Sequence, residues 1–583
     1  MTRKILWVVV SFLLVAALVL ASCAKEEVVE EEEEEEEEPA VGEPQYGGTL
    51  THIGTWTWGG GPDNWDPTQG MQVLWATPYL ERLLQGDIDK HGPRGTNEFS
   101  FGTMGIVPEE YLGGLLAESW EWTTPLTLVY QIRPGVYWAG KEHVMASREL
   151  TAYDVEFAYN YYIYDVLTPE AREGYFYYLD SVTATDTYTV VIEFKTFFFN
   201  WAKILGYGSG WPYIGQIFPE EMVEAGIEDW RNQVGTGPFI LTDYVYGSYA
   251  TYSRNPDYWG TTTINGKEYP IPFVDELVFP IIPDESARIA ALRTGKVDWM
   301  GNVAIEYMGT LTDTSPDLTL DTFLREAMDC IVCLRTDQEP FNKKEVRRAL
   351  MVGTDYEALI DTLFPYGEIV AWPFYSLSPY HTPLDELPES AQVLYSNDPD
   401  LAAQMLADEG YPHGFPMKIT ISGDSLIQQD VVSLYVDQWA RFGVEVEINV
   451  VENVLHGSMV SDADYEDAIM RGMGIAKPED HMNLLYLNPA SNTPHYDNSW
   501  FVEQYALMTA TPDLAERTAL FKELAVFLLD EVAIIPHPIP VLVNAYWPWV
   551  KNYYGEIDCG EHNYVAIEAR IWIDEVLKAE MGY

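Results

Sequence analysis

Basic residues are scarce in this chain. The 583 residues include 33 Lys and Arg against 91 Asp and Glu, which gives a formal net charge of -58 at pH 7. The unbroken run Glu30–Glu38 supplies only a small part of this excess, so the folded body is itself strongly acidic. A surface with this charge repels nucleic acid and anionic lipid headgroups. We therefore exclude nucleic-acid binding. A saline habitat would favour the same excess, so the charge does not indicate the ligand.

Cysteine is also rare, with four residues: Cys23, Cys330, Cys333 and Cys559. The spacing Cys330-Ile-Val-Cys333 occurs in redox and metal sites. Here the surroundings are apolar, residues three apart on a strand point to opposite faces, and no second pair or histidine cluster completes a zinc site. We expect a buried strand at this position, and we expect no metal and no cofactor.

Enzyme motifs are missing as well. The chain has no G-x-S-x-G nucleophile elbow, no H-E-x-x-H zinc motif and no Walker A loop. Asp462–Asp467 resembles the start of an EF-hand loop, but Asp467 stands where that loop needs glycine. We therefore predict no catalytic residue. A secreted hydrolase that uses some of the many carboxylates remains an alternative, and a purely structural surface protein is another.

The N-terminal segment has the pattern of a bacterial lipoprotein leader. Arg3-Lys4 precedes an apolar run, Ile5–Leu20, and small residues stand just before Cys23. The run is shorter than the roughly 20 residues that span a bilayer. We predict a signal peptide over residues 1–22, a lipid on Cys23, and a disordered acidic tether over residues 23–45. The mature protein would then be extracytoplasmic and held at the cell membrane by its lipid alone.

The second half of the chain alternates between helix and strand patterns. From Asp398 a helix to Glu409 is followed by a strand at Met417–Ser422, a helix at Leu426–Phe442 and a strand at Val444–Val451. Strands separated by single helices indicate parallel βαβ units. The fold class is therefore α/β.

Several short motifs occur in an order that resembles one protein family. Along the chain they are Gly47–Leu50, Tyr79–Leu84, Gly114–Trp122, Tyr130–Trp138, Thr151–Val155, Gly235–Phe239, Arg254–Trp259, Ala291–Asp298 and Val346–Leu350. Together they resemble the extracytoplasmic solute-binding proteins of ABC importers, family 5, which bind peptides, oligopeptides or nickel. The resemblance runs from about Tyr46 to about Ala579. It makes Gly47–Leu50 the first strand and Tyr79–Leu84 the first helix.

This resemblance implies a two-lobed α/β fold of the type II periplasmic-binding-protein kind. The first lobe would take residues 46–308, including an extra subdomain inserted at about 63–230, and the chain would return to it over residues 538–583. Residues 309–537 would form the second lobe. The two segments that cross between the lobes would act as a hinge, and closure would bury the ligand between the lobes.

Six residues are candidates for ligand binding. Trp56 and Trp58 would stack on the ligand, and the resemblance places Trp372 and Tyr375 in a loop that would face the cleft. Arg471 and Asp480 would hold the charged ends of the ligand. Trp56 and Trp58 stand next to glycines, which let a ligand approach a flat ring. Relatives often hold the amino group of a peptide with an acidic residue that follows the strand matching Asp467–Arg471. That position does not align cleanly here, so Asp480 is a candidate for an amino group and Arg471 could equally hold a carboxylate.

The function that follows is capture of an extracellular peptide and delivery to an ABC permease with its ATPase subunits. An oligosaccharide, bound through stacked tryptophans, or a nickel complex is the alternative ligand within the family. We expect a monomer that contacts the membrane through its lipid only.

Overall fold

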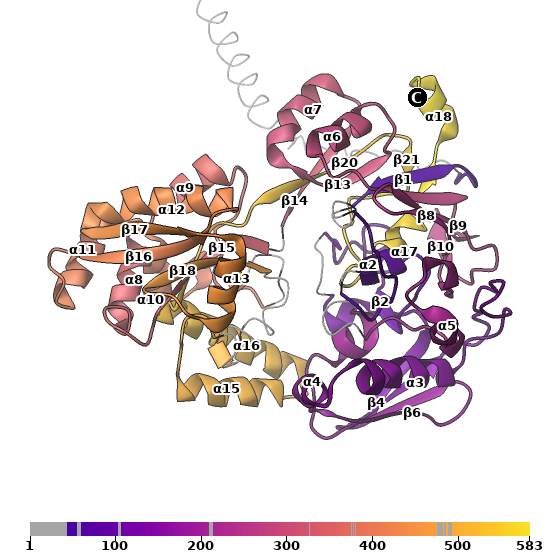
Figure 1. Ribbon diagram of the computed structural model, residues 1–583, viewed down its shortest axis with the longest axis horizontal. Coiled ribbons are helices and arrows are strands. Elements are labelled where there is room, and N and C mark those ends of the chain that lie inside the picture. Colours follow the sequence, from indigo (N-terminus) through magenta and orange to yellow (C-terminus); the bar gives the residue numbers. More distant parts are fainter. Residues whose placement is uncertain are drawn as a thin grey trace, which may run out of the picture. The chain divides into compact units, whose positions relative to one another are not determined.

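The computed structural model describes residues 43–54, 57, 60–70, 72–102, 107–208, 214–325, 327–374, 376, 378, 380–474, 482, 486–487 and 492–583 (Figure 1). The expected signal peptide, the lipidation residue Cys23 and most of the expected tether lie outside these residues. Residues Pro44–Tyr583 form one unit. No helix among the described residues has the length and apolar character needed to cross a bilayer.

The first lobe is built on a seven-stranded sheet with the order β14-β20-β13-β1-β12-β9-β8. Its strands are β1 Thr49–Ile53, β8 Phe239–Val245, β9 Tyr249–Arg254, β12 Glu276–Pro280, β13 Trp299–Ala304, β14 Thr319–Leu324 and β20 Val541–Tyr546. The strand β1 is parallel to β12 and β13, whereas β20 is antiparallel to both β13 and β14. The expectation that Gly47–Leu50 opens the first strand is confirmed by β1.

A separate four-stranded antiparallel sheet, with the order β4-β5-β7-β6, comes between β1 and β8 in the sequence. It contains β4 Ala117–Thr124, β5 Thr127–Ile132, β6 Leu179–Ala184 and β7 Thr189–Phe194. The helix α3, Ala152–Asn160, packs against this sheet and begins with a capping box formed by Thr151 and Asp154. This sheet and helix form the subdomain inserted in the first lobe.

The segment Tyr79–Leu84, expected to be a helix, is not helical, and this expectation was wrong. The preceding helix α2 ends at Ala76. Three carbonyl groups of the segment accept hydrogen bonds of 2.9–3.0 Å from the amides of Leu115, Ile217 and Gly237. A helix would need those carbonyls for its own backbone bonds. Pairing with distant parts of the chain therefore overrides the local pattern.

The second lobe is built on a five-stranded sheet with the order β17-β16-β18-β15-β19. Its strands are β15 Ala327–Leu334, β16 Phe415–Ser422, β17 Val444–Val451, β18 Ala468–Gly474 and β19 Ile534–Pro536. The strand β16 is parallel to β17 and β18, and the 14-residue helix α12, Leu426–Trp439, connects β16 to β17. The predicted βαβ unit is confirmed. Cys330 and Cys333 are fully buried in β15 and form no disulfide, as expected for a packing strand.

The remaining elements surround these sheets (Figure 1). Short antiparallel pairs join β2 Leu84–Gly86 to β3 Leu112–Gly114, β10 Thr261–Ile264 to β11 Lys267–Pro270, and β21 Val550–Lys551 to β22 Trp572–Ile573. The other helices are α2 Gln72–Ala76, α4 Pro169–Tyr175, α5 Glu220–Gly226, α6 Glu285–Arg293, α7 Met308–Thr314, α8 Lys344–Val352, α9 Tyr356–Leu363, α10 Glu389–Gln392, α11 Pro399–Asp408, α13 Asn453–Asp462, α15 Ser499–Thr509, α16 Leu514–Glu531, α17 Val565–Glu568 and α18 Glu575–Glu580.

The chain passes between the two large sheets twice, once from β14 to β15 and once from β19 to β20. The two crossings are tied together, because the amide of Arg325 donates a hydrogen bond of 2.9 Å to the carbonyl of Pro540. In addition, Nε2 of His537 accepts a 2.8 Å hydrogen bond from the amide of Cys330. Since β14 belongs to the first sheet, we propose that the first crossing follows Leu324 and not residue 308.

Candidate ligand-binding site

The structure describes two of the six predicted ligand residues, Trp372 and Arg471. Trp56, Trp58, Tyr375 and Asp480 lie outside the described residues. These four therefore remain predictions.

Trp372 is buried in the second lobe, with 1% of its surface exposed. Its indole Nε1 donates a hydrogen bond of 2.8 Å to the hydroxyl of Tyr486. The ring of Tyr486 in turn packs edge to face against Tyr496 and Phe501, at centroid distances of 5.5 and 5.8 Å. The indole thus faces protein on its polar edge, and a role in ligand stacking remains a prediction.

Arg471 lies on β18, opposite Ile331 of β15, and its side chain is half-buried. One guanidinium nitrogen, Nη1, donates a hydrogen bond of 2.8 Å to Oγ1 of Thr493. The Nε atom is buried and has no hydrogen-bond partner among the residues that the structure describes. Among the described residues, no carboxylate forms an ion pair with Arg471. A guanidinium has five N–H donors arranged in a planar fork, so the described part of the chain uses only a fraction of this donor capacity.

Two described side chains near Arg471, those of Cys333 and His456, supply no negative charge to it. Burial raises the pKa of the Cys333 thiol to about 12, although the positive charge of Arg471 opposes this shift. Burial lowers the pKa of His456, and Arg471 lowers it further. At neutral pH the thiol and the imidazole are therefore both uncharged.

A second arginine of the same lobe shows the opposite arrangement. Arg335 follows β15, and its Nε and Nη2 donate to the two carboxylate oxygens of Asp337 at 2.8 and 2.9 Å. The guanidinium also lies over the ring of Tyr465, 5.6 Å from its centroid. Its charge is already paired, so Arg335 has little capacity for a ligand carboxylate.

The two lobes touch through a third arginine, which sequence reasoning did not identify. Arg517 of α16, 2% exposed, donates a hydrogen bond of 2.8 Å to Oε1 of Glu109 in the first lobe. Phe199 and Phe521 pack beside this pair with ring centroids 5.9 Å apart. Burial raises the pKa of Glu109 even though the charge of Arg517 lowers it. No sequence motif marks this pair, because the partners are 408 positions apart.

A cavity of about 170 Å³ lies next to the Arg517–Glu109 pair. Its walls come from both lobes, with Glu109 and Lys203 on one side and Tyr380 and Thr518 on the other. Typical small-molecule sites measure about 300–1,000 Å³. The cavity is therefore too small for a whole peptide.

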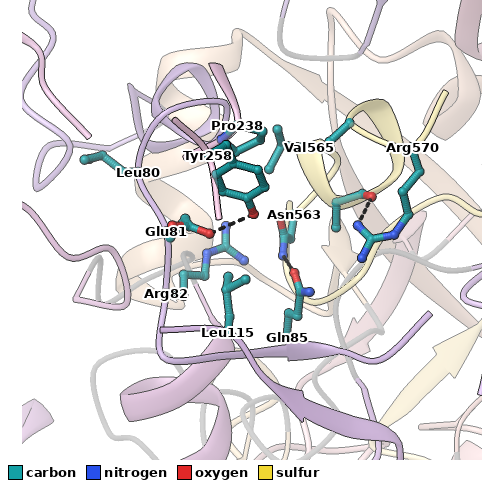
Figure 2. Close-up of a pocket in the computed structure, with 12 residues that line it drawn as sticks. Leu80, Glu81, Arg82, Gln85, Leu115, Pro238, Tyr258, Asn563, Val565 and Arg570 are labelled. Carbon is teal, nitrogen blue, oxygen red and sulfur yellow. Dashed lines mark hydrogen bonds between the residues drawn. The ribbon is translucent and has the colours of Figure 1, made fainter. Parts of the chain in front are cut away.

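A second pocket is enclosed within the first lobe, next to Glu81 (Figure 2). The carboxylate of Glu81 accepts hydrogen bonds from the hydroxyl of Tyr258 at 3.0 Å and from Nε1 of Trp259 at 3.3 Å. Burial raises the pKa of Glu81 to about 7. The pocket holds about 20 Å³, enough for about one water molecule, so it cannot accept a solute.

Two large sheets that the chain joins by two crossings, with a subdomain inserted in the first lobe, define the class of protein: a two-lobed solute-binding fold. A solved structure of the periplasmic binding protein DppA from Helicobacter pylori, in complex with the peptide STSA, matches with a TM-score of 0.66. The match covers 91% of this chain and 99% of that one at 20% sequence identity. The expected type II fold is confirmed.

The family model described as "Bacterial extracellular solute-binding proteins, family 5 Middle" matches residues 112–494. The chain belongs to this family of ABC solute-binding proteins, as its motifs indicated. It is 25% identical over 484 residues to heme-binding protein A of Haemophilus influenzae, covering 78% of this chain and 83% of that protein. It is 24% identical over 495 residues to di/tripeptide-binding protein 2 of Pseudomonas aeruginosa, covering 78% of this chain and 85% of that protein.

Proposed function

We propose that the protein captures an extracellular peptide between its lobes, holds the C-terminal carboxylate with Arg471, and delivers the peptide unchanged to an ABC permease. The observation that carries the proposal is the half-buried guanidinium of Arg471, which donates to Thr493 and forms no ion pair with any carboxylate of the described residues. The di/tripeptide-binding relative and the peptide-bound DppA structure support a peptide as ligand. Asp480 would hold the amino end, and Trp56 and Trp58 would stack on the ligand.

Heme is the second candidate, because one relative of comparable identity is named as a heme-binding protein. Heme also carries carboxylates, so Arg471 would suit either ligand. The two are separated by absorbance, since bound heme gives a strong visible band and a peptide gives none. A neutral oligosaccharide has no carboxylate and would not depend on Arg471.

The proposal is tested with the purified full chain and two probes, the tripeptide Ala-Ala-Ala and the same tripeptide with an amidated C-terminus. Native mass spectrometry of the protein from its source identifies any ligand that is retained on purification. Isothermal titration calorimetry then compares the two probes. We expect the free carboxylate to bind at least tenfold more tightly than the amide, because charge-assisted hydrogen bonds are about twice as strong as neutral ones. Equal affinity, or cleavage of either probe, would exclude the proposed function.

We also propose that a lipid on Cys23 retains the protein at the cell membrane. The leader pattern and the small residues before Cys23 support this. The variant Cys23→Ser should appear in the soluble fraction of cells that otherwise hold the protein in the membrane fraction. Membrane retention of the variant would contradict the lipid anchor.

A further inference from the structure

The strand β14 forms one edge of the seven-stranded sheet and is paired on one side only, with β20. In an antiparallel pair, successive residues point their amide and carbonyl groups alternately toward and away from the partner strand. The amide of Arg325 donates to Pro540 in the same register, so Arg325 faces the β20 side. Because the direction alternates along the strand, the amide and carbonyl groups of Phe323 and Asp321 point toward β20, as those of Arg325 do. Those of Leu320, Thr322 and Leu324 point away from the sheet.

These outward groups are unpaired. Within the part of the chain that the structure describes, no hydrogen bond is made by the backbone amides or carbonyls of Leu320, Thr322 and Leu324 on this outer side. An exposed row of such groups is a template for another strand. Proteins commonly protect an edge of this kind by covering it, and a peptide can supply the missing strand.

An open groove of about 720 Å³ lies at the end of this edge that is formed by Thr322–Leu324, and we call it the hinge groove. One wall is β14 itself, at Thr322–Leu324. The other wall belongs to the second lobe and includes Ile360 of α9, Tyr366 and Ile369. Tyr366 is 76% exposed, which is unusual for an aromatic side chain at a groove. The hinge groove therefore combines free backbone groups with apolar and aromatic side chains for an extended segment.

The negative charge of the residues that line the hinge groove favours a basic segment as its occupant. Among the described residues, its lining includes Glu357 and Glu368 and no Lys or Arg. A basic segment is attracted to such a lining, whereas the glutamate run Glu30–Glu38 of this chain is repelled by it. Acidic side chains on an edge strand also disfavour pairing between two copies of the same edge, and Asp321 of β14 adds a further carboxylate.

We propose that the hinge groove binds an extended basic segment of another polypeptide, which adds as a strand to the outer edge of β14. Backbone hydrogen bonds to Leu320, Thr322 and Leu324 hold the segment, and its Lys or Arg side chains pair with Glu357 and Glu368. Because the groove is formed by both lobes next to the crossings, the bound segment contacts both lobes at once. The site is separate from Arg471 and does not depend on the proposed ligand.

The test uses the full chain and a capped peptide, acetyl-Thr-Lys-Val-Lys-Val-Lys-Thr-amide, with a twin in which Glu replaces each Lys. The caps remove both charged ends, so binding at Arg471 does not contribute. Hydrogen exchange with residue-level fragmentation should show slower exchange of the amides of Leu320, Thr322 and Leu324 with the basic peptide. The acidic twin should give no protection. Protection elsewhere, or equal binding of the two peptides, would overturn the proposal.

Matched variants separate the backbone contribution from folding. Thr322→Pro removes one outward donor and leaves the pairing with β20 in place, whereas Thr322→Val keeps the donor. We expect the basic peptide to bind at least tenfold more weakly to the proline variant, measured by fluorescence anisotropy, and within twofold of normal to the valine variant. If the proline variant is unfolded by circular dichroism, the double variant Glu357→Gln with Glu368→Gln decides, because it should weaken binding about fivefold and reduce the salt dependence.

Two further outcomes would contradict the proposal. Protection of the β14 amides without added peptide would mean that a second copy or a segment of this chain already occupies the edge. Weaker binding of the basic peptide to Arg471→Met would place it in the site of the proposed function. An unchanged affinity for this variant is the result that we expect, whatever the outcome of the tripeptide experiment.

Discussion

Glu81 in the first lobe and Arg471 in the second lobe are both ionisable side chains in partly apolar surroundings, but they differ in how completely they are hydrogen-bonded. Glu81 accepts from Tyr258 and Trp259 and faces a pocket of about 20 Å³. Arg471 is half-buried and donates to Thr493, and its Nε has no partner within the described ranges of the chain. We infer from this comparison that unused hydrogen-bonding capacity, more than enclosure, would distinguish a group that binds a ligand from one that stabilises the fold.

The largest expected effect concerns Glu81 and the pH dependence of stability. Burial raises the pKa of this carboxyl from 4.5 to about 7, so the folded protein retains a proton that the unfolded chain has released. The stability that the neutral carboxyl contributes is complete below the pKa that Glu81 has in the unfolded chain. It is lost as the pH rises through the pKa that Glu81 has in the folded protein. At about 1.36 kcal/mol for each pKa unit, the loss is about 3 kcal/mol. The variant Glu81→Gln should not show this loss of stability with rising pH.

Denaturant unfolding of the protein and of Glu81→Gln at pH 4.5 and pH 8 measures this difference. The stability of the variant relative to the unchanged protein should rise by about 3 kcal/mol between the two pH values. Glu110→Gln is the matched control, because Glu110 is exposed. Its relative stability should stay the same. If the relative stability of Glu81→Gln also stayed the same between the two pH values, Glu81 would not be the stabilising group that the comparison with Arg471 assumes.

The next effect concerns Arg471 and the binding of a free peptide carboxylate. Arg471→Met removes the guanidinium but keeps much of the apolar stem, so we expect about 2 kcal/mol of binding free energy to be lost, a factor of about 30. Calorimetric titration with Ala-Ala-Ala measures the change.

Arg335→Met is the control for Arg471. Its guanidinium is already paired with Asp337, so the affinity for the tripeptide should change less than twofold. Equal losses in the two variants would mean that general electrostatic attraction, and not unused donors, controls binding.

A smaller effect is expected at the contact between the lobes. Glu109→Gln keeps the size of the side chain and removes the charge that pairs with Arg517. The pair is partly buried, so we expect about 1 kcal/mol, seen as a roughly fivefold weaker apparent affinity for the tripeptide if the contact belongs to the ligand-bound state. The preference for the free carboxylate over the amide should not change. A loss of that preference would show that Glu109 contacts the ligand directly.

Local sequence signals predicted much of the fold. The alternation of helix and strand from Asp398 gave the βαβ unit, because a regular pattern reports local periodicity directly. The prediction of a helix at Tyr79–Leu84 was wrong, because carbonyl groups of this segment accept hydrogen bonds from amides far along the chain. Such pairing cannot be inferred from the segment itself.

The candidate site was predictable only in part. The family resemblance suggested Arg471, at the end of the strand matching Asp467–Arg471, although the acidic position of relatives did not align cleanly. Its hydrogen-bond partner Thr493 is 22 positions away. The burial of Trp372 likewise depends on Tyr486, 114 positions away. The Arg517–Glu109 contact had no local signal at all. Side chains brought together by tertiary packing require the structure.

The place of β20 within its sheet has a consequence for the order in which the chain can fold. This strand enters near the end of the chain and is inserted between β13 and β14, which have no pairing with each other. Until residues Val541–Tyr546 are available to pair, the sheet of the first lobe lacks an interior strand. The first lobe can therefore complete its sheet only after almost the whole polypeptide has been made. A product truncated before Val541 would leave β13 and β14 each with an unpaired strand edge, which chaperones and proteases recognise.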